Sequence, residues 1–298
     1  MELSVIIVSY YSREMMRECV QSIFDFNDLP DDELEVIVVE NSPLDEALAM
    51  RELLVQFAGK PVKFIRNDCN RGYGGGNNAG IKQASGKVVA VMNPDIRLHK
   101  PLFKRAVEEF KSKNTLAMLG FKQIGNQSIS YYLNPEFYFP LLRSFVERVA
   151  NRMNRFNSRY FFLSGAFVFF DRQKFWDAGG FDEAIFLYME EADISHRIRE
   201  RAYSIQFIAG YSYLHLIDER VGFTAKAYRH LLDSLSYYCE KYNFNERKIR
   251  NRMLFEHRFK KKVARLLGRV ELEAVMNSNI EVLLARSAGT ATIHVDNN

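Results

Sequence analysis

One acidic side chain, that of Asp95, stands where a buried strand is expected to end, and it suits metal binding. Asp95 follows the apolar run Lys87–Met92 and the pair Asn93-Pro94. A carboxylate there can hold Mg²⁺ or Mn²⁺ against a diphosphate, because these cations prefer oxygen ligands and share them with substrate phosphates. A proline turn with a capping aspartate would use the same residues, so this position alone leaves both interpretations open.

A second acidic group, Glu190-Glu191-Ala192-Asp193, stands at the start of a helix that we predict over Met189–Arg201. Three carboxylates in the first turn stabilise a helix N-terminus through the helix dipole. They also suit catalysis, with one carboxylate as general base and another organising Arg197 on the same helical face. Either role explains this composition.

His215 lies at the end of a predicted strand, within the segment Tyr211–Leu216. A lone histidine is more often a core or surface residue than a ligand. Beside Asp95, however, its imidazole would be a suitable further ligand for a divalent metal.

Glycines are concentrated between the third and fourth predicted strands, in the segment Asn70–Gly80. As a loop, this segment would let backbone N–H groups approach a phosphate in front of a helix N-terminus. Gly74, Gly76 and Ala79 also match a dinucleotide-binding pattern, with Asp95 about 20 residues further on, which keeps an NAD-dependent dehydrogenase as an alternative. That pattern belongs to a first strand and turn, whereas this segment follows the third strand, so the signal is weak.

The first third of the chain alternates strands and helices. The predicted strands are Leu3–Tyr10, Glu35–Glu40, Val62–Asn67 and Lys87–Met92, and the helices are Arg13–Phe26, one from Pro43 to near Gly59, and one ending at Ile81. Their β-branched runs fit strands buried on both faces, which predicts a doubly wound, mostly parallel α/β sheet. Ligands bind at the carboxyl ends of strands in such sheets, where residues 9–11, 40–42 and 93–95 stand.

The alternation ends near residue 114. Tyr131–Arg159 is rich in aromatic residues and arginine without a clean period, so we expect a long, irregular and partly mobile segment. We predict one strand over Phe161–Phe170, a strand pair over Ile205–Leu216, and helices over residues 224–268.

Short motifs in this order resemble the family 2 glycosyltransferases with the GT-A fold, most closely their bacterial rhamnosyltransferase-like branch. The matching pieces are Val8-Ser9-Tyr10, Val39-Glu40-Asn41-Ser42, Asn70 with Gly72 and Gly76-Asn77-Asn78-Ala79-Gly80, Met92-Asn93-Pro94-Asp95, Ser164-Gly165-Ala166, Gly179-Gly180-Phe181-Asp182-Glu183, and Glu190-Glu191-Ala192-Asp193 with Arg197. They cover residues 3–220, and the ordered set is far more specific than any single piece.

The resemblance implies a role for each matching residue. The implied donor-binding residues are Ser9, Tyr10, Glu40, Asn41, Asn70, Gly72, Gly76, Asn77, Asn78, Asn93 and Asp95. Asp95 and His215 would bind the metal, Mg²⁺ or Mn²⁺. Glu191 stands at the position of the catalytic aspartate, with Glu190 and Asp193 in support. Residues 1–98 would form the donor-binding half, 99–222 the acceptor-binding and catalytic half, and 223–298 a helical extension.

Three residues depart from the family pattern. Asn93 replaces the first aspartate of the usual Asp-x-Asp motif, which leaves fewer charged metal ligands. Glu40 replaces an aspartate that would face the base, and Glu191 lengthens the implied base by one methylene. Because a shift near 1 Å matters for positioning, a non-catalytic nucleotide- or glycan-binding module is a further alternative.

The expected activity is an inverting transfer from a nucleoside-diphosphate sugar to a hydroxyl of a glycan or lipid-linked acceptor, in cell-surface polysaccharide synthesis. A dTDP- or UDP-sugar is the expected donor, and the resemblance to the rhamnosyltransferase-like branch suggests dTDP-rhamnose.

Positive charge is concentrated near the C-terminus. Residues Arg247–Arg269 contain ten Lys or Arg and one acid, Glu256, although the whole chain carries only +4. Phe255, Phe259, Val263 and Leu266 lie at helical spacing among these charges, which is typical of a helix on an anionic membrane surface. The alternative is that this apolar stripe packs on the catalytic domain. We expect no nucleic-acid partner, because the remainder of the chain is acidic.

The cysteines and the N-terminus indicate the expected location. Three widely spaced cysteines, Cys19, Cys69 and Cys239, argue against a disulfide framework or a C-x-x-C metal site. The N-terminus lacks the features of a signal peptide, and no apolar stretch reaches the roughly 18 residues of a membrane span. We therefore expect a cytoplasmic protein, peripheral on the inner face of the plasma membrane.

Overall fold

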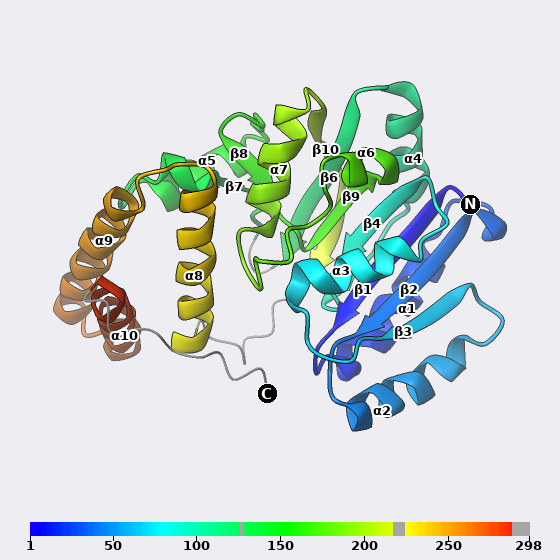
Figure 1. Ribbon diagram of the computed structural model, residues 1–298, viewed down its shortest axis with the longest axis horizontal. Helices are drawn as coiled ribbons and strands as arrows, with labels where there is room; N and C mark the ends of the chain where they lie inside the picture. Colours follow the sequence, from blue (N-terminus) through cyan, green and yellow to red (C-terminus); the bar gives the residue numbers. More distant parts are fainter. Residues whose placement is uncertain (126–127, 217–223, 288–298) are drawn as a thin grey trace.

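The computed structural model describes residues 1–125, 128–216 and 224–287, and a mixed eight-stranded sheet forms its centre (Figure 1). The strand order is β3-β2-β1-β4-β9-β6-β10-β5. The first four are β1 (Leu3–Ser9), β2 (Leu34–Glu40), β3 (Val62–Arg66) and β4 (Val88–Met92), and they pair with one another in parallel, whereas β4 pairs antiparallel with its next neighbour in the sheet. The predicted doubly wound, mostly parallel arrangement is confirmed for this half.

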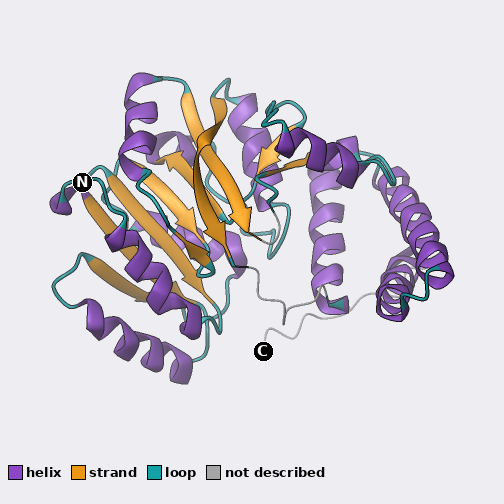
Figure 2. Cartoon of the chain, turned by 180° about the vertical axis from the view of Figure 1, so that it is seen from behind, coloured by secondary structure: helices purple, strands orange, loops and turns teal. Residues whose placement is uncertain are grey.

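Helices cover both faces of the sheet because alternate strand residues face opposite sides. In β1, Val5 and Ile7 belong to the core beneath α1 (Arg13–Asp25), α2 (Leu44–Leu54) and α4 (Phe103–Ser112). Ile6 belongs to the opposite core, which packs against α3 (Gly72–Lys82), α6 (Arg172–Asp177) and α7 (Glu190–Glu200). Figures 1 and 2 show these two helical layers from opposite sides.

The second half differs from the sequence prediction in its strands. β6 (Leu116–Gly125) was not predicted. The single strand expected over Phe161–Phe170 is two strands in different sheets: β8 (Phe161–Leu163) pairs with β7 (Tyr131–Leu133), and β9 (Phe167–Asp171) joins the main sheet. The bend at Gly165 between them separates the two runs.

The expected strand pair over Ile205–Leu216 is one long strand, β10 (Ser204–His215), with a register shift between Ile208 and Ser212. Such a bulge breaks the regular alternation and imitates a turn in the sequence. β10 runs parallel to β6 on one side and antiparallel to the short β5 (Ile96–Arg97) on the other.

The segment Tyr131–Arg159 is not irregular as predicted. It contains β7, a 3₁₀ turn η3 (Pro135–Phe137) and the helix α5 (Arg143–Arg152). The helical period was missed because α5 buries polar residues, Glu147 and Asn151, on its inner side.

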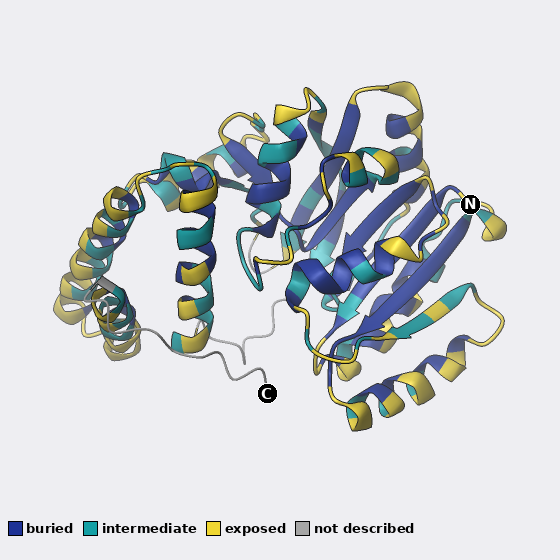
Figure 3. Ribbon diagram, in the orientation of Figure 1, coloured by how far each residue is buried: buried dark blue, intermediate teal, exposed yellow. Residues whose placement is uncertain are grey.

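Three helices lie beside the sheet, α8 (Ala225–Lys241), α9 (Glu246–Leu266) and α10 (Val270–Ser287) (Figure 1). The predicted helical region over 224–268 is thus two helices, and α10 extends it. Much of α9 and α10 is exposed (Figure 3). The predicted boundary between residues 222 and 223 falls outside the described residues. Within the described parts of the chain, no helix is both long and apolar enough to cross a membrane.

Candidate active site

The carboxyl ends of β1 and β2 lie side by side, because the strand register pairs Ser9 with Glu40. Both side chains are buried, and Glu40 Oε1 accepts a hydrogen bond from the Ser42 N–H at 2.9 Å. Tyr10 is exposed directly after them. These residues stand at the strand ends where ligands bind in an open α/β sheet.

Asparagine side chains connect β2 to the segment before α3. Asn41 donates to the Gly72 carbonyl at 3.2 Å and to Asn70 Oδ1 at 3.4 Å, and it accepts from Asn67 at 2.7 Å. Asn70 Oδ1 also accepts from the Gly72 N–H at 2.9 Å. We call these four residues the amide network, and it fixes the approach to α3.

The glycine-rich segment, expected as a loop, is helical from Gly72 onward. A Cβ at Gly76 would lie 2.8 Å from Val8, and one at Gly80 would lie 2.4 Å from Ile6. The helix therefore packs directly on β1, and its glycines are required for that close approach. They do not form the open phosphate-binding loop of a dinucleotide fingerprint.

The two asparagines inside α3 are buried and bonded to protein atoms. Asn77 donates to the Tyr73 carbonyl at 2.9 Å. Asn78 accepts from the Phe181 N–H at 3.0 Å and donates to the Phe181 carbonyl at 2.8 Å and to Glu183 at 3.1 Å. Asn78 thus holds the turn before α7 against α3, while donor contact by either asparagine stays a prediction.

Asp95 and His215, 120 residues apart in sequence, are brought together. His215 Nε2 lies 3.0 Å from Asp95 Oδ2. The pairing of His215 with Ile96 fixes this contact, since β10 and β5 are adjacent strands, and the Leu216 N–H donates to the Asp95 carbonyl at 2.9 Å. The predicted proximity of these two residues is therefore present.

The Asp95–His215 pair has free ligand atoms. Asp95 Oδ1 and His215 Nδ1 are buried without a hydrogen-bond partner among the described residues. The Asp95 carboxylate and the His215 Nε2 that faces it are an oxygen and an imidazole nitrogen suited to one divalent cation such as Mn²⁺, while Nδ1 lies on the far side of the ring. In residues 1–125, 128–216 and 224–287, no group of three or more His, Cys, Asp or Glu side chains is arranged to hold a metal. The two residues fit a metal that completes its coordination with substrate oxygens.

Glu191 lies against the bend at Gly165. A Cβ at Gly165 would lie 2.0 Å from Glu191 Oε1 and 2.7 Å from the Tyr73 hydroxyl, so only glycine fits there. The Gly165 N–H bonds the Glu191 carboxylate, and Tyr73 donates to the Gly165 carbonyl at 2.7 Å. Burial raises the pKa of Glu191 above that of an ordinary glutamate, and it outweighs the backbone N–H groups of Glu191 and Gly165, which lower it.

Glu190 is more deeply buried than Glu191, and its Oε1 has no hydrogen-bond partner in the described structure. Burial, followed by the charge of Glu191, raises its pKa well above the ordinary value. Tyr188 and Met189, just before α7, have left-handed φ angles of 69° and 72°, which non-glycine residues rarely adopt. Raised pKa values and such backbone strain are typical of functional sites.

Asp193, the third acid, is fully paired. Its Oδ2 accepts from Arg197 Nε at 2.9 Å, which confirms the predicted pair on one helical face. Its Oδ1 accepts from Lys241 at 2.6 Å and from the Tyr242 hydroxyl at 2.7 Å. Lys241 also reaches Asp182 at 2.6 Å, so α8 is attached to the start of α7 through these side chains. The carboxylate of Asp193 positions this helix.

The bend at Gly165 connects Glu191 to the Asp95–His215 pair. The Asn93 N–H donates to the Ala166 carbonyl at 2.8 Å, and Asn93 is two residues before Asp95. Tyr73, Gly165 and Lys241 received no role in the sequence analysis. The motif Ser164-Gly165-Ala166 was the only signal that pointed to one of them, whereas the Lys241 contact depends on long-range packing.

Comparison with known proteins settles the family. Residues 4–179 match the family model described as glycosyl transferase family 2, which is more than half of the chain. The chain belongs to glycosyl transferase family 2. This confirms the predicted family, and the dehydrogenase alternative is not supported.

Two curated relatives are similar to parts of this family 2 chain. A hexosyltransferase of low-salt glycan biosynthesis from Haloferax volcanii is 25% identical over 209 residues, which are 68% of this chain and 64% of that protein. An uncharacterized glycosyltransferase of Bacillus subtilis is 31% identical over 121 residues, which are 40% of this chain and 30% of that protein. The chain thus covers less than two thirds of each relative.

Solved structures show the same fold at low sequence identity. A mannosyltransferase from Pyrobaculum calidifontis, in complex with GDP-Man and Mn²⁺, has a TM-score of 0.60 at 16% identity, covering 98% of this chain and 76% of that one. S. aureus TarS residues 1–349 with UDP-GlcNAc gives 0.55 at 16% identity, covering 100% and 95%. The GT-A fold predicted from the sequence is confirmed.

Proposed function

We propose that this chain is an inverting glycosyltransferase that moves a sugar from a nucleoside-diphosphate donor to an acceptor hydroxyl. The observation that carries this proposal is the bend at Gly165. Gly165 touches the Glu191 carboxylate of α7, and the next residue, Ala166, accepts a hydrogen bond from the N–H of Asn93, two residues before Asp95 of the Asp95–His215 pair. A base beside a diphosphate-binding edge is what a single displacement at an anomeric carbon requires.

Glu191 is the proposed general base. Its carboxylate removes the proton of the acceptor hydroxyl while the acceptor oxygen forms a bond to the anomeric carbon. The bond from that carbon to the donor phosphate oxygen breaks, and the nucleoside diphosphate leaves. The raised pKa of Glu191 makes its carboxylate a stronger base than an exposed glutamate, and its protonated form is uncharged in this buried place.

Asp95 and His215 are the proposed ligands of Mg²⁺ or Mn²⁺, with the remaining positions left to the donor diphosphate. When bound, such a cation would neutralise the charge that develops on the departing diphosphate. Asn93 offers an uncharged side chain where an acidic ligand is usual, which predicts weaker metal binding than in a site with two aspartates.

The remaining donor contacts are assigned to the strand ends. Ser9, Tyr10 and Glu40 are the proposed base and ribose contacts. We propose that Asn41, Asn70, Gly72, Gly76 and Asn78 contribute through the position of α3, because they are already engaged with protein atoms. Asn77 donates to Tyr73, but its buried Oδ1 has no partner in the described residues and is proposed as a direct donor contact.

The acceptor is proposed to be a glycan or a lipid-linked sugar, and the donor a UDP- or dTDP-sugar, with dTDP-rhamnose among the candidates. A lipid-linked acceptor is supported by the exposed apolar stripe of α9. Phe255, Phe259, Val263 and Leu266 are all exposed beside basic residues, so the stripe is not packed on the catalytic domain. We propose that it rests on an anionic membrane.

A thermal-shift screen tests the function. The ligands are UDP-, dTDP- and GDP-sugars and NAD, each with and without Mn²⁺, followed by assay of nucleoside diphosphate release for every sugar nucleotide that binds. We expect stabilisation by at least one sugar nucleotide with Mn²⁺, and turnover once an acceptor is added. Binding without turnover across acceptors would favour a non-catalytic module, and stabilisation by NAD alone would overturn the proposal.

A further inference from the structure

Helix α5 exposes its apolar side and buries its polar side. Five apolar residues of α5 and its flanks are exposed: Leu142, Phe145, Val146, Val149 and Met153. At about 100° per residue they fall within an arc of about 100° on the helix surface. Phe145 alone is 65% exposed. An ordinary surface helix turns such an arc toward the core, so α5 has the reverse orientation.

Hydrogen bonds fix this orientation. The buried Glu147 accepts from the Leu133 N–H at 3.0 Å, and the buried Asn151 accepts from the Ser130 N–H at 2.7 Å and donates to the Tyr131 carbonyl at 2.9 Å. Rotating α5 to bury its apolar arc would break all three bonds and leave buried groups of β7 unpaired. The apolar arc therefore stays outside.

Positive charge borders the arc. Arg148 and Arg152 lie along one side of it and Arg143 lies along the other, and Arg148 and Arg152 are exposed. The single acid of α5, Glu147, is buried and bonded to Arg143 at 3.0 Å. An exposed apolar arc between arginines has the charge and shape of a helix lying at the interface of an anionic bilayer.

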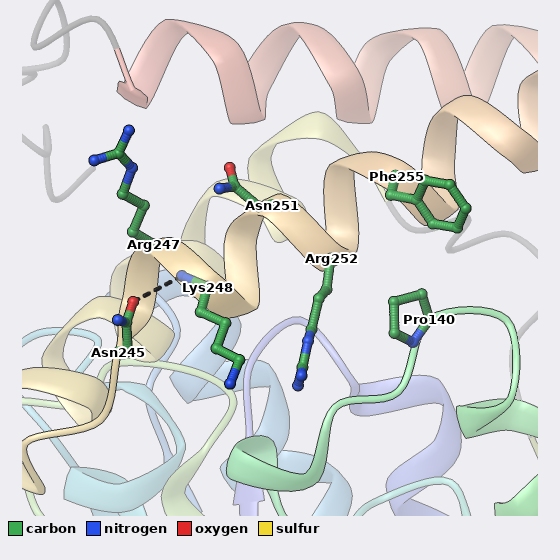
Figure 4. A pocket seen from close by; sticks show the side chains of 7 residues that line it. All are labelled: Pro140, Asn245, Arg247, Lys248, Asn251, Arg252 and Phe255. Carbon is green, nitrogen blue, oxygen red and sulfur yellow. Dashed lines mark hydrogen bonds between the residues drawn. The ribbon is translucent and has the colours of Figure 1, made fainter.

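The start of α5 is attached to α9. The Tyr138 hydroxyl donates to the buried Glu256 at 2.6 Å, and Arg252 donates to the Tyr138 carbonyl at 3.0 Å. Pro140 and Phe255 line one open hollow, and Lys248 and Arg252 extend from α9 toward the Pro140 loop (Figure 4). The segment between η3 and α5 thus holds the beginning of α5 close to α9, with Pro140 beside Phe255 of the apolar stripe.

We propose that α5 is a second membrane-contacting element, and that its apolar arc enters the interface of an anionic lipid bilayer next to the stripe of α9. A second copy of this chain is the less suitable occupant. A two-fold contact would bring the same arginine-bordered surface against itself, and like charges would meet. Anionic headgroups instead complement those arginines.

The position of α5 relates this surface to the proposed reaction, and this step rests on the proposed function. The inner face of α5 bonds to β7, and Tyr132 in the middle of that strand packs against the cluster that contains Ala192, the residue after Glu191 in α7. The membrane-contacting helix and the proposed base thus lie on opposite sides of one short strand. An acceptor sugar on a lipid carrier at α5 has a short path to Glu191.

Vesicle flotation with a double variant tests the proposal. Phe145→Ser with Val149→Ser removes the centre of the arc, and Leu48→Ser on α2 is the matched control, because Leu48 is comparably exposed on a helix at the far end of the molecule (Figure 1). Vesicles are phosphatidylcholine with and without phosphatidylglycerol, at low and moderate salt. Circular dichroism and thermal unfolding check that each variant is folded.

We expect wild-type and control protein to float with anionic vesicles, and the α5 variant to bind them at least about tenfold more weakly. Unchanged binding of the variant overturns the proposal and leaves α9 as the contact. The proposal is also overturned if gel filtration shows that the wild-type protein is a dimer and that the α5 variant is a monomer. Donor binding by wild-type protein without vesicles is measured separately, so failure of the proposed function is distinguished from failure of this surface.

Discussion

Two buried polar regions at the same edge of the sheet differ in how completely their groups are paired. In the amide network, Asn41 bonds to three neighbours at 2.7 to 3.4 Å. At the start of α7, Glu190 Oε1 has no partner in the described chain, and the pKa values of Glu190 and Glu191 are raised. Paired groups stabilise a fold, whereas poorly paired carboxyls cost stability and are retained where chemistry needs them. The difference supports the proposal that the first region is structural and that the second takes part in proton transfer.

The largest effect is expected from Glu191→Gln. The substitution keeps the shape of the side chain and removes its ability to accept a proton, so transfer should fall by about 10²–10⁴. Donor affinity should survive, as measured by calorimetry beside the transfer assay. If Glu190→Gln slows transfer more than Glu191→Gln does, the base has been assigned to the wrong carboxylate.

Gly165→Ala should displace the base without removing it. The new methyl group would lie 2.0 Å from Glu191 Oε1, and a shift of this kind can cost about 10² in rate. Gly210→Ala is the matched control, because a Cβ there meets no atom within 4 Å. Measured side by side, the transfer rate of Gly165→Ala should be lower than that of Gly210→Ala. Equal rates would indicate that Glu191 is not the general base.

Asn78→Ala tests a paired polar group outside the amide network, the α3 asparagine that bonds to Phe181. It leaves the Phe181 N–H and carbonyl without their partner, which should cost about 1–3 kcal/mol of unfolding free energy. Chemical denaturation measures this loss, and donor affinity should change little at a temperature where the variant is folded. A large loss of donor affinity with unchanged stability would indicate that Asn78 contacts the donor directly.

The smallest effect is a change in how stability depends on pH. The pKa of Glu190 is raised on folding, so its contribution to stability is fully present below the ordinary glutamate pKa and is lost as pH rises through the raised value. Glu190→Gln removes this loss. As pH rises from the ordinary glutamate pKa through the raised pKa of Glu190, the melting temperature of the variant should therefore increase relative to that of the wild type. A difference in melting temperature that does not change with pH would argue against a buried carboxyl that resists ionisation.

Much of the first half could be predicted from the sequence because parallel strands are continuous β-branched runs. β1, β2 and β4 appeared close to their predicted positions, and Asp95 follows the last of them as expected. His215 was raised as a ligand beside Asp95 from its place at a strand end, and the family resemblance supported this, since no local pattern reports a contact over 120 residues.

Other features could not be predicted because tertiary packing overrides local preference. Glycine is a poor helix former, yet α3 begins at Gly72 because only glycines allow its close approach to β1. α5 was missed since its polar side chains face inward, opposite to the usual pattern. The carboxylate of Asp193 suggested catalysis from sequence, but its pairing with Lys241 depends on a helix almost 50 residues away.

Calorimetry of sugar-nucleotide binding, with and without Mn²⁺, to wild-type protein and to Asp95→Ala tests the central claim most directly. Asp95 and His215 are the proposed ligands of a divalent metal, which would supply positive charge to the donor diphosphate. We expect Mn²⁺ to strengthen binding of the sugar nucleotide to the wild-type protein, and Asp95→Ala to abolish that gain while the thermal unfolding transition remains cooperative. An equal Mn²⁺-dependent gain in the folded variant would contradict the account.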